Sequence, residues 1–264
     1  NIPRATRIKR ILIGDPVNLG RAHLLLGLIA NGSGQSAEAL KHYTVALALY
    51  EQNDSLREIA IACCDLGDVY LRRGEYLQAQ AVLRRSLSLA ERIGDFPVIG
   101  FALGNLGVLN IRMGNLVESE KEFRQAISLV EHMDDLASVS IWHTYLASAL
   151  QEQGKLSDAG STVYRALTVA RIMHLAPCLG PALVTIANMR VAYAMILISK
   201  VNNSHHDPEI SKVLRSAKNT TKRVLALEGI EAETRTEAQL VLSQVALLSG
   251  ELDVAKSYVL QTLE

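Results

Sequence analysis

Residues 66–87 read LGDVYLRRGEYLQAQAVLRRSL, two apolar patterns of helical spacing joined at a glycine. Leu66, Val69 and Tyr70 precede Gly74 on one helical face, and apolar residues resume at the same spacing after it. Glycine ends a helix well because it adopts the left-handed backbone conformation without a steric penalty. The stretch therefore predicts a helical hairpin that turns at Gly74.

This hairpin pattern repeats every 40 residues. The turn glycine recurs as Gly34, Gly74, Gly114 and Gly154. A small residue seven positions earlier recurs as Gly27, Gly67, Gly107, Ala147 and Ala187. Small side chains at one register allow two helix axes to approach closely. A fixed period of this length predicts a stack of helical hairpins, each packed on its neighbours.

The pattern of Leu66, Gly67, Tyr70, Ala79 and Leu83 resembles the tetratricopeptide repeat (TPR). The tryptophan usual near the start of the first helix is absent, because that position holds His23, Cys63, Leu103 and His143. The 40-residue period and the LAERIGD junction at residues 89–95 resemble the repeats of MalT-type bacterial transcriptional activators and related signalling ATPases. The resemblance implies an all-α fold, a right-handed α-α superhelix of about six TPR-like hairpins.

One TPR-like solenoid is expected to span residues 1–264. Its predicted units cover residues 17–54, 55–94, 95–134, 135–174, 177–230 and 231–264. The fifth unit is longer because Gly154 and Gly250 lie 96 residues apart, two periods plus 16, with the surplus near residues 199–208. Residues 1–15 are expected to be the tail of a preceding repeat. Since no polar capping helix is visible near the other end, we expect a longer parent protein or a partner copy there.

Composition narrows the class of protein. The chain is 49% hydrophobic, which predicts a folded protein with a large core. Its 27 basic and 27 acidic residues balance, so nucleic acid is not an expected partner of this segment. The three cysteines include adjacent Cys63 and Cys64, which suits a reducing, cytoplasmic setting. The apolar run at residues 191–198 is far shorter than the ~20 residues of a membrane span, so a buried helix is expected.

The resemblance also implies a partner-binding groove on the first helices of the hairpins. Its predicted residues are Ile61, Asp68, Leu71, Arg72, Phe101, Val108, Ile111, Arg112, Ile141, Thr144, Ser148, Gln151 and Asn188. Their apolar content favours an amphipathic helix or an extended peptide as the partner. The alternative is that these side chains pack against one another or against a helix outside this segment.

Two further hypotheses concern other partners. A small inducer could bind within the superhelix, with Thr144, Ser148, Gln151 and Asn188 as its polar contacts, by resemblance to MalT-type repeats. The long fifth hairpin, residues 182–227, could instead join two copies as a homodimer.

No constellation of residues predicts catalysis, a metal or a cofactor. His205, His206 and Asp207 are adjacent but lack a third ligand at suitable spacing, so a solvated loop is expected there. Cys63 and Cys64 are expected to fill space in a helix. Asp95, Asp134 and Asp135 precede predicted helices and are expected to cap them. Phosphate loops and nucleophile-base motifs are absent from the sequence, so the protein is not predicted to be an enzyme.

Overall fold

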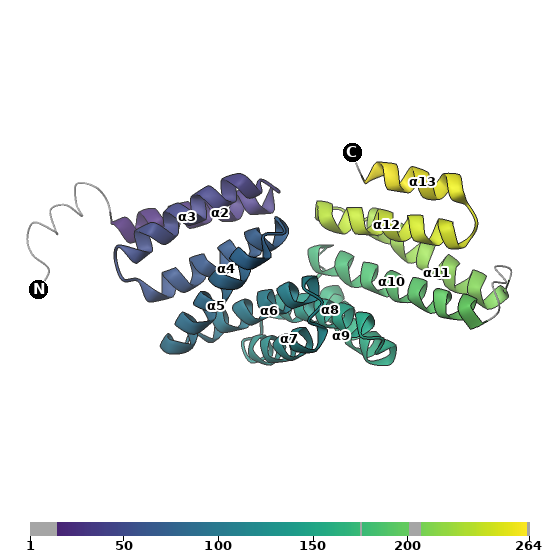
Figure 1. Ribbon diagram of the computed structural model, residues 1–264, viewed down its shortest axis with the longest axis horizontal. Coiled ribbons are helices and arrows are strands. Elements are labelled where there is room, and N and C mark those ends of the chain that lie inside the picture. Colours follow the sequence, from purple (N-terminus) through teal and green to yellow (C-terminus); the bar gives the residue numbers. More distant parts are fainter. Residues whose placement is uncertain (1–14, 175, 201–206, 263–264) are drawn as a thin grey trace, which may run out of the picture. The chain divides into compact units, whose positions relative to one another are not determined.

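The computed structural model describes residues 15–174, 176–200 and 207–262, and every regular element in these ranges is an α-helix (Figure 1). The helices are α2 (Pro16–Gly32), α3 (Ser36–Glu51), α4 (Leu56–Arg72), α5 (Tyr76–Ile93), α6 (Phe96–Arg112), α7 (Leu116–Glu131), α8 (Leu136–Glu152), α9 (Leu156–Met173), α10 (Ala176–Lys200), α11 (Pro208–Leu225), α12 (Ala232–Leu248) and α13 (Leu252–Gln261). The predicted all-α fold is confirmed. Of the expected N-terminal tail, residues 1–14 lie outside the described residues.

The chain forms two compact units, residues 1–133 and residues 134–264. In the first unit α2 pairs with α3, α4 with α5 and α6 with α7 (Figure 1). In the second unit the pairs are α8 with α9, α10 with α11 and α12 with α13. Within each unit the second helix of one hairpin packs on the first helix of the next. These are TPR-like hairpins, as predicted, whereas a single array over residues 1–264 stays a prediction.

The turns inside the hairpins use the predicted glycines. Their φ angles are 74° at Gly34, 73° at Gly74, 77° at Gly114, 76° at Gly154 and 79° at Gly250. In the turn at Gly74 the amide of Glu75 donates to the carbonyl of Tyr70 at 2.9 Å, which ties the end of α4 to the start of α5. The left-handed role predicted for these glycines is confirmed.

Close packing inside each hairpin depends on the small residue seven positions before the turn. A Cβ added to Gly67 would overlap the fully buried Leu83, and one added to Gly107 would lie 2.8 Å from Phe123. At the same register of the fourth hairpin, Ala147 belongs to a buried cluster with Val163. Large side chains on the second helices therefore occupy the space that the small residues leave.

Two of the three predicted aspartate caps are confirmed. The Asp95 carboxylate accepts from the amide of Val98 at 3.2 Å, and the Asp135 carboxylate accepts from the amide of Ser138 at 3.1 Å. Asp134 instead has a φ of 54° and lies in the turn before the cap, so its predicted capping role was wrong. A carboxylate at these positions satisfies backbone N–H groups that have no partner within the helix.

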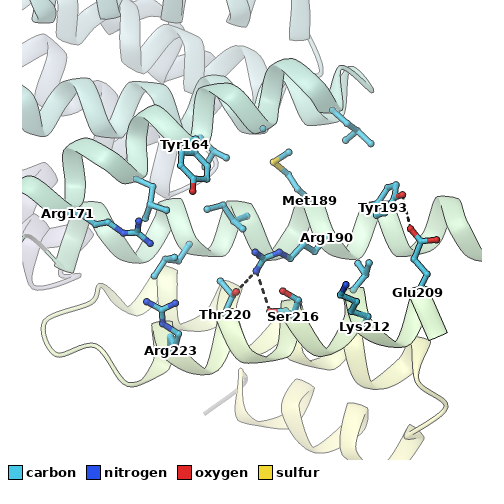
Figure 2. Close-up of a pocket in the computed structure, with 17 residues that line it drawn as sticks. Tyr164, Arg171, Met189, Arg190, Tyr193, Glu209, Lys212, Ser216, Thr220 and Arg223 are labelled. Carbon is cyan, nitrogen blue, oxygen red and sulfur yellow. Dashed lines mark hydrogen bonds between the residues drawn. The ribbon is translucent and has the colours of Figure 1, made fainter. Parts of the chain in front are cut away.

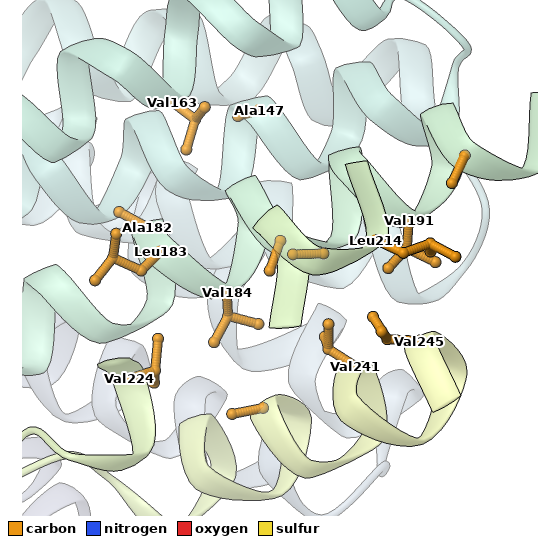
Figure 3. Packing of buried hydrophobic residues seen from close by; sticks show 14 of the residues in the cluster. Ala147, Val163, Ala182, Leu183, Val184, Val191, Leu214, Val224, Val241 and Val245 are labelled. Carbon is orange, nitrogen blue, oxygen red and sulfur yellow. The ribbon is translucent and has the colours of Figure 1, made fainter. Parts of the chain in front are cut away.

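The first helix of the fifth hairpin, α10, is 25 residues long, whereas α4, α6 and α8 have 17 each. By length and composition alone it could cross a membrane, so the sequence argument that its apolar run is too short was wrong. One side of α10 forms the core of the second unit, with Leu183, Val184 and Val191 buried against side chains of α11 and α12 (Figure 3). The predicted buried helix is confirmed.

The loop after α10 is only partly described. His205 and His206 lie outside the described residues, whereas Asp207 caps α11 by accepting from the amide of Glu209 at 2.7 Å. Within the described ranges, no group of three or more His, Cys, Asp or Glu side chains is placed to hold a metal ion.

Candidate functional site

The predicted groove residues of the first unit lie on α4 and α6, which pack side by side. Phe101 is 39% exposed, and Ile61 at the same register of α4 is half-buried. Val108 and Ile111 are half-buried, and the side chain of Arg112 is exposed at the end of α6. Apolar side chains with a basic residue beside them are therefore accessible on these first helices.

Polar groups adjoin this apolar surface on α4. Asp68 accepts from the side-chain amide of Asn31 at 2.8 Å and forms an ion pair with Arg72, whose Nε lies 3.1 Å from the carboxylate. Arg72 is exposed, so this pair contributes little to stability. The network orders Asp68 and Arg72 at the edge of the surface.

Two predicted groove residues are buried. Leu71 is 8% exposed because it faces the core shared with Leu106 and Leu109 of the next hairpin. Thr144 is 6% exposed, and its hydroxyl donates to the carbonyl of Ser140 at 2.9 Å. The prediction that these two side chains meet a partner was wrong, since neighbouring helices cover them.

In the second unit the remaining predicted residues are Ile141, Ser148, Gln151 and Asn188. Ile141 is exposed on α8, and the other three are half-buried. The Ser148 hydroxyl donates to the carbonyl of Thr144 at 3.3 Å, so its proton is used inside the helix. Thr144 and Ser148 therefore donate within α8, which leaves only Gln151 and Asn188 of the four polar side chains predicted to contact an inducer.

Asp65 on α4 is a titratable group that the sequence analysis did not single out. Burial, with a smaller contribution from the nearby Asp68 carboxylate, raises the pKa of its carboxyl to about 7. The carboxyl therefore exchanges protons near neutral pH, where an ordinary aspartate is fully ionised. A cationic group close to Asp65 would favour its ionised form.

Where the structure describes the chain, its cysteines and histidines form no reactive arrangement. Cys63, Cys64 and Cys178 are free and buried, and burial raises the pKa of the Cys63 thiol to about 11. A buried thiol with a raised pKa is a poor nucleophile, which agrees with a space-filling role. The rings of His23 and His42 share a hydrogen bond of 2.9 Å between their Nδ1 atoms, so they are part of the packing between α2 and α3.

A pocket of about 720 Å³ opens in the second unit between α9, α10 and α11 (Figure 2). Its lining residues are Leu156, Gly160, Val163, Tyr164, Leu167, Arg171, Leu183, Ile186, Met189, Arg190, Tyr193, Glu209, Lys212, Val213, Ser216, Thr220 and Arg223. The volume falls within the roughly 300–1,000 Å³ of typical small-molecule sites. No residue predicted for the groove lines this pocket.

Charged groups surround the apolar floor of the pocket. Arg171 and Arg223 lie at one end and Tyr193 with Glu209 at the other, while Arg190 lies between them (Figure 2). The hydroxyl of Tyr193 donates to Glu209 at 3.3 Å. Burial lowers the pKa of Arg190, whose guanidinium donates to the carbonyl of Ser216 at 3.3 Å and to the hydroxyl of Thr220. The pocket therefore combines an apolar floor with four cations and one carboxylate.

Comparison with known proteins agrees with this architecture. The family model of the MalT-like TPR region matches residues 17–197. No match was found among curated protein sequences.

Among solved structures, the apo form of RapI superposes with a TM-score of 0.69 and 10% identity, covering 98% of this chain and 87% of RapI. A Rap protein complexed with competence and sporulation factor superposes with a TM-score of 0.60 and 14% identity, covering 97% of this chain and 69% of the Rap protein. A kinesin light chain with TPR-like repeats from Podosopora anserina superposes with a TM-score of 0.57 and 13% identity, covering 80% of this chain and 98% of that protein. At these identities the likeness shows the shared fold. With more than half of its length matched by the family model, the chain belongs to the MalT-like TPR family.

Proposed function

We propose that the chain is a non-catalytic scaffold that binds a protein or peptide segment through the first helices of its hairpins. The observation that carries this proposal is the exposure of Phe101 at a register where Ile141 is also exposed and Ile61 half-buried. Large exposed aromatic side chains are frequent anchors of protein interfaces. Covering them removes apolar surface from water, which favours binding by about 25 cal/mol per Å² before association costs.

The partner best suited to this surface is an amphipathic helix or an extended peptide with alternate apolar side chains. Arg72, which is paired with Asp68, and Arg112 lie at the ends of α4 and α6, so polar groups border the apolar surface. The Rap protein complexed with competence and sporulation factor shares this fold and supports a role in binding another molecule. Membership of the MalT-like family supports a regulatory or sensory role within a larger cytoplasmic bacterial protein.

A displayed library of random peptides, selected against the purified chain, tests this proposal. Phe101→Asp should weaken the selected peptides about tenfold or more, because a charge replaces the apolar anchor. The matched control is Leu77→Asp, which places the same charge at a residue 77% exposed near the start of α5, outside the proposed surface. Equal binding by wild type and Phe101→Asp would refute the surface. Light scattering of the same samples reports whether a second copy is the partner.

A small inducer held by Ser148, Gln151 and Asn188 is the second candidate function. The family resemblance supports it, while the buried Thr144 removes one of its proposed contacts. The pocket between α9, α10 and α11 offers a small molecule a cavity of about 720 Å³ in the same unit.

A further inference from the structure

The pocket in the second unit exists because the repeat pattern is broken at Gly160. The equivalent positions of the three preceding hairpins hold Leu40, Gln80 and Glu120, each with a side chain that reaches beyond Cβ. At Gly160 a Cβ would meet only the end of Met189, at 3.6 Å. The glycine therefore opens space above α10 that the hairpin does not need for its own packing.

Two cations of the pocket also depart from the repeat. Arg171 on α9 takes the register of Glu51, Glu91 and Glu131, so the charge is reversed relative to the three preceding hairpins. Arg190 on α10 takes a register where the preceding first helices hold uncharged residues, namely Ala30, Tyr70, Asn110 and Leu150. Both Arg171 and Arg190 add positive charge beside the space opened at Gly160. The fold does not require a positive charge at either position, because the preceding hairpins form without one.

These cations lack acidic partners. Among the described residues, no carboxylate lies within ion-pair distance of Arg171, Lys212 or Arg223, and the hydrogen bonds of Arg190 go to the neutral oxygens of Ser216 and Thr220. Arg171, Lys212 and Arg223 are exposed, whereas Arg190 is half-buried, and holding this partly desolvated guanidinium without a counter-charge costs free energy. An anion bound in the pocket would recover part of this cost.

We propose that the pocket between α9, α10 and α11 binds a small organic anion that carries an apolar body. The anionic group lies among Arg171, Arg190 and Arg223, where guanidinium groups donate to carboxylate or phosphate oxygens. The apolar body lies along Met189 and its neighbours, toward the end of the pocket that holds Tyr193 (Figure 2). This inference does not depend on the peptide surface of the first unit.

Each helix presents one face to such a ligand. On α10 the lining residues Leu183, Ile186, Met189, Arg190 and Tyr193 follow helical spacing, and the lining residues of α9 and α11 do likewise. Leucine, isoleucine and methionine side chains suit an alkyl or aromatic body, whereas a fully polar sugar would leave them in contact with hydroxyl groups. Toward the far end Glu209 is accompanied by Lys212, so positive charge is in excess only at the end that holds Arg171 and Arg223 (Figure 2).

Binding is tested on the full chain with sodium decanoate and decyl phosphate, which share a body and differ in headgroup. Decan-1-ol and decylammonium are the uncharged and cationic counterparts. The sequence has five methionines, so carbon-13-labelled methyl groups give few signals, and that of Met189 is assigned with Met189→Leu. We expect decanoate, decyl phosphate or both to shift the Met189 signal saturably, the tighter one identifying the headgroup. Titration calorimetry gives the affinities.

The charge requirement is tested with Arg171→Met/Arg223→Met, which should weaken the anion about tenfold or more. The matched control is Arg165→Met/Arg215→Met, which removes two exposed arginines from the same helices outside the pocket and should change affinity by less than about twofold. Gly160→Leu restores the residue of the first hairpin and should abolish binding while every cation remains. Circular dichroism checks that each variant is folded.

Three results would overturn the proposal. One is the absence of a saturable Met189 shift with both anions. Another is an equal loss of affinity in the two double variants, which would reduce the effect to overall charge. The last is binding of decan-1-ol as tight as that of the anions, which would leave an apolar cavity without anion recognition. Peptide binding through Phe101 is measured separately, so either proposal can fail alone.

Discussion

At the scale of single residues, the hairpins balance volume between one small and one large side chain. Gly27, Gly67 and Gly107 face Tyr43, Leu83 and Phe123, and an added Cβ would come within 3 Å of each partner. The fourth hairpin instead pairs Ala147 with the smaller Val163. A methyl group gained on one helix is therefore accompanied by a smaller side chain on the other, as expected for a close-packed interface.

This exchange predicts the behaviour of Gly67→Ala. The new methyl group would overlap Leu83, which is fully buried and has no room to move, so we expect a loss of about 1–3 kcal/mol despite the better helix propensity of alanine. Adding Leu83→Val recreates the pair of the fourth hairpin. The double variant should be more stable than the sum of the single effects implies. Chemical unfolding followed by circular dichroism measures all three variants.

Gly160→Ala is the control for this cycle, since a Cβ there would make only an ordinary contact with Met189. It should leave stability unchanged or raise it by up to about 1 kcal/mol, the helix-propensity gain alone. Strict additivity of Gly67→Ala and Leu83→Val would contradict the volume exchange.

At the scale of whole helices, equivalent positions differ in what covers them. Leu66 on α4 is 3% exposed because α3 packs against this face, whereas Leu26 at the same register of α2 is 47% exposed. Ile29 and Val69 show the same contrast. Both helices carry large apolar residues at these two registers, so the different burial of these side chains depends on the neighbouring helix.

The pair of helices allows one substitution to be compared in two environments. Leu66→Ala should cost about 2–5 kcal/mol, because it leaves a cavity beside Tyr43 and Val69. Leu26→Ala should cost less than about 1 kcal/mol, since nearly half of the side chain is already in water. Thermal and chemical unfolding provide the measurement. Similar costs at the two positions would show that α2 is covered in solution.

At the scale of the molecule, the 40-residue period predicted what each hairpin needs for itself. Gly74 and its equivalents had to end helices, and Gly67 had to face a large residue, so both follow from local sterics. The groove assignment was less accurate, because the burial of Leu71 and Thr144 depends on how adjacent hairpins pack. The pocket depends on how α11 packs beside α9 and α10, which the repeat pattern does not specify, although the change from glutamate to Arg171 was visible in the sequence.

Each compact unit buries its own hydrophobic clusters, so destabilisation is expected to remain where it is introduced. Leu66 belongs to a cluster within α2, α3 and α4, and Leu214 belongs to a cluster that spans α8 to α12 (Figure 3). In stacked repeats the free energy of opening is mainly a sum over repeats and their nearest neighbours. Local opening therefore need not involve every hairpin at once.

Hydrogen exchange measured by mass spectrometry tests this with two matched substitutions. Leu66→Ala should speed amide exchange roughly 30-fold or more in α2 to α5, because removing about 2 kcal/mol or more raises the population of the locally open state by that factor, and it should leave α10 and α11 unchanged. Leu214→Ala should speed amide exchange in α10 to α12 and leave exchange in α2 to α5 unchanged. Leu26→Ala is the control, since this exposed leucine should alter exchange only weakly. A uniform increase across both units in either leucine variant would mean that the chain opens as one cooperative structure.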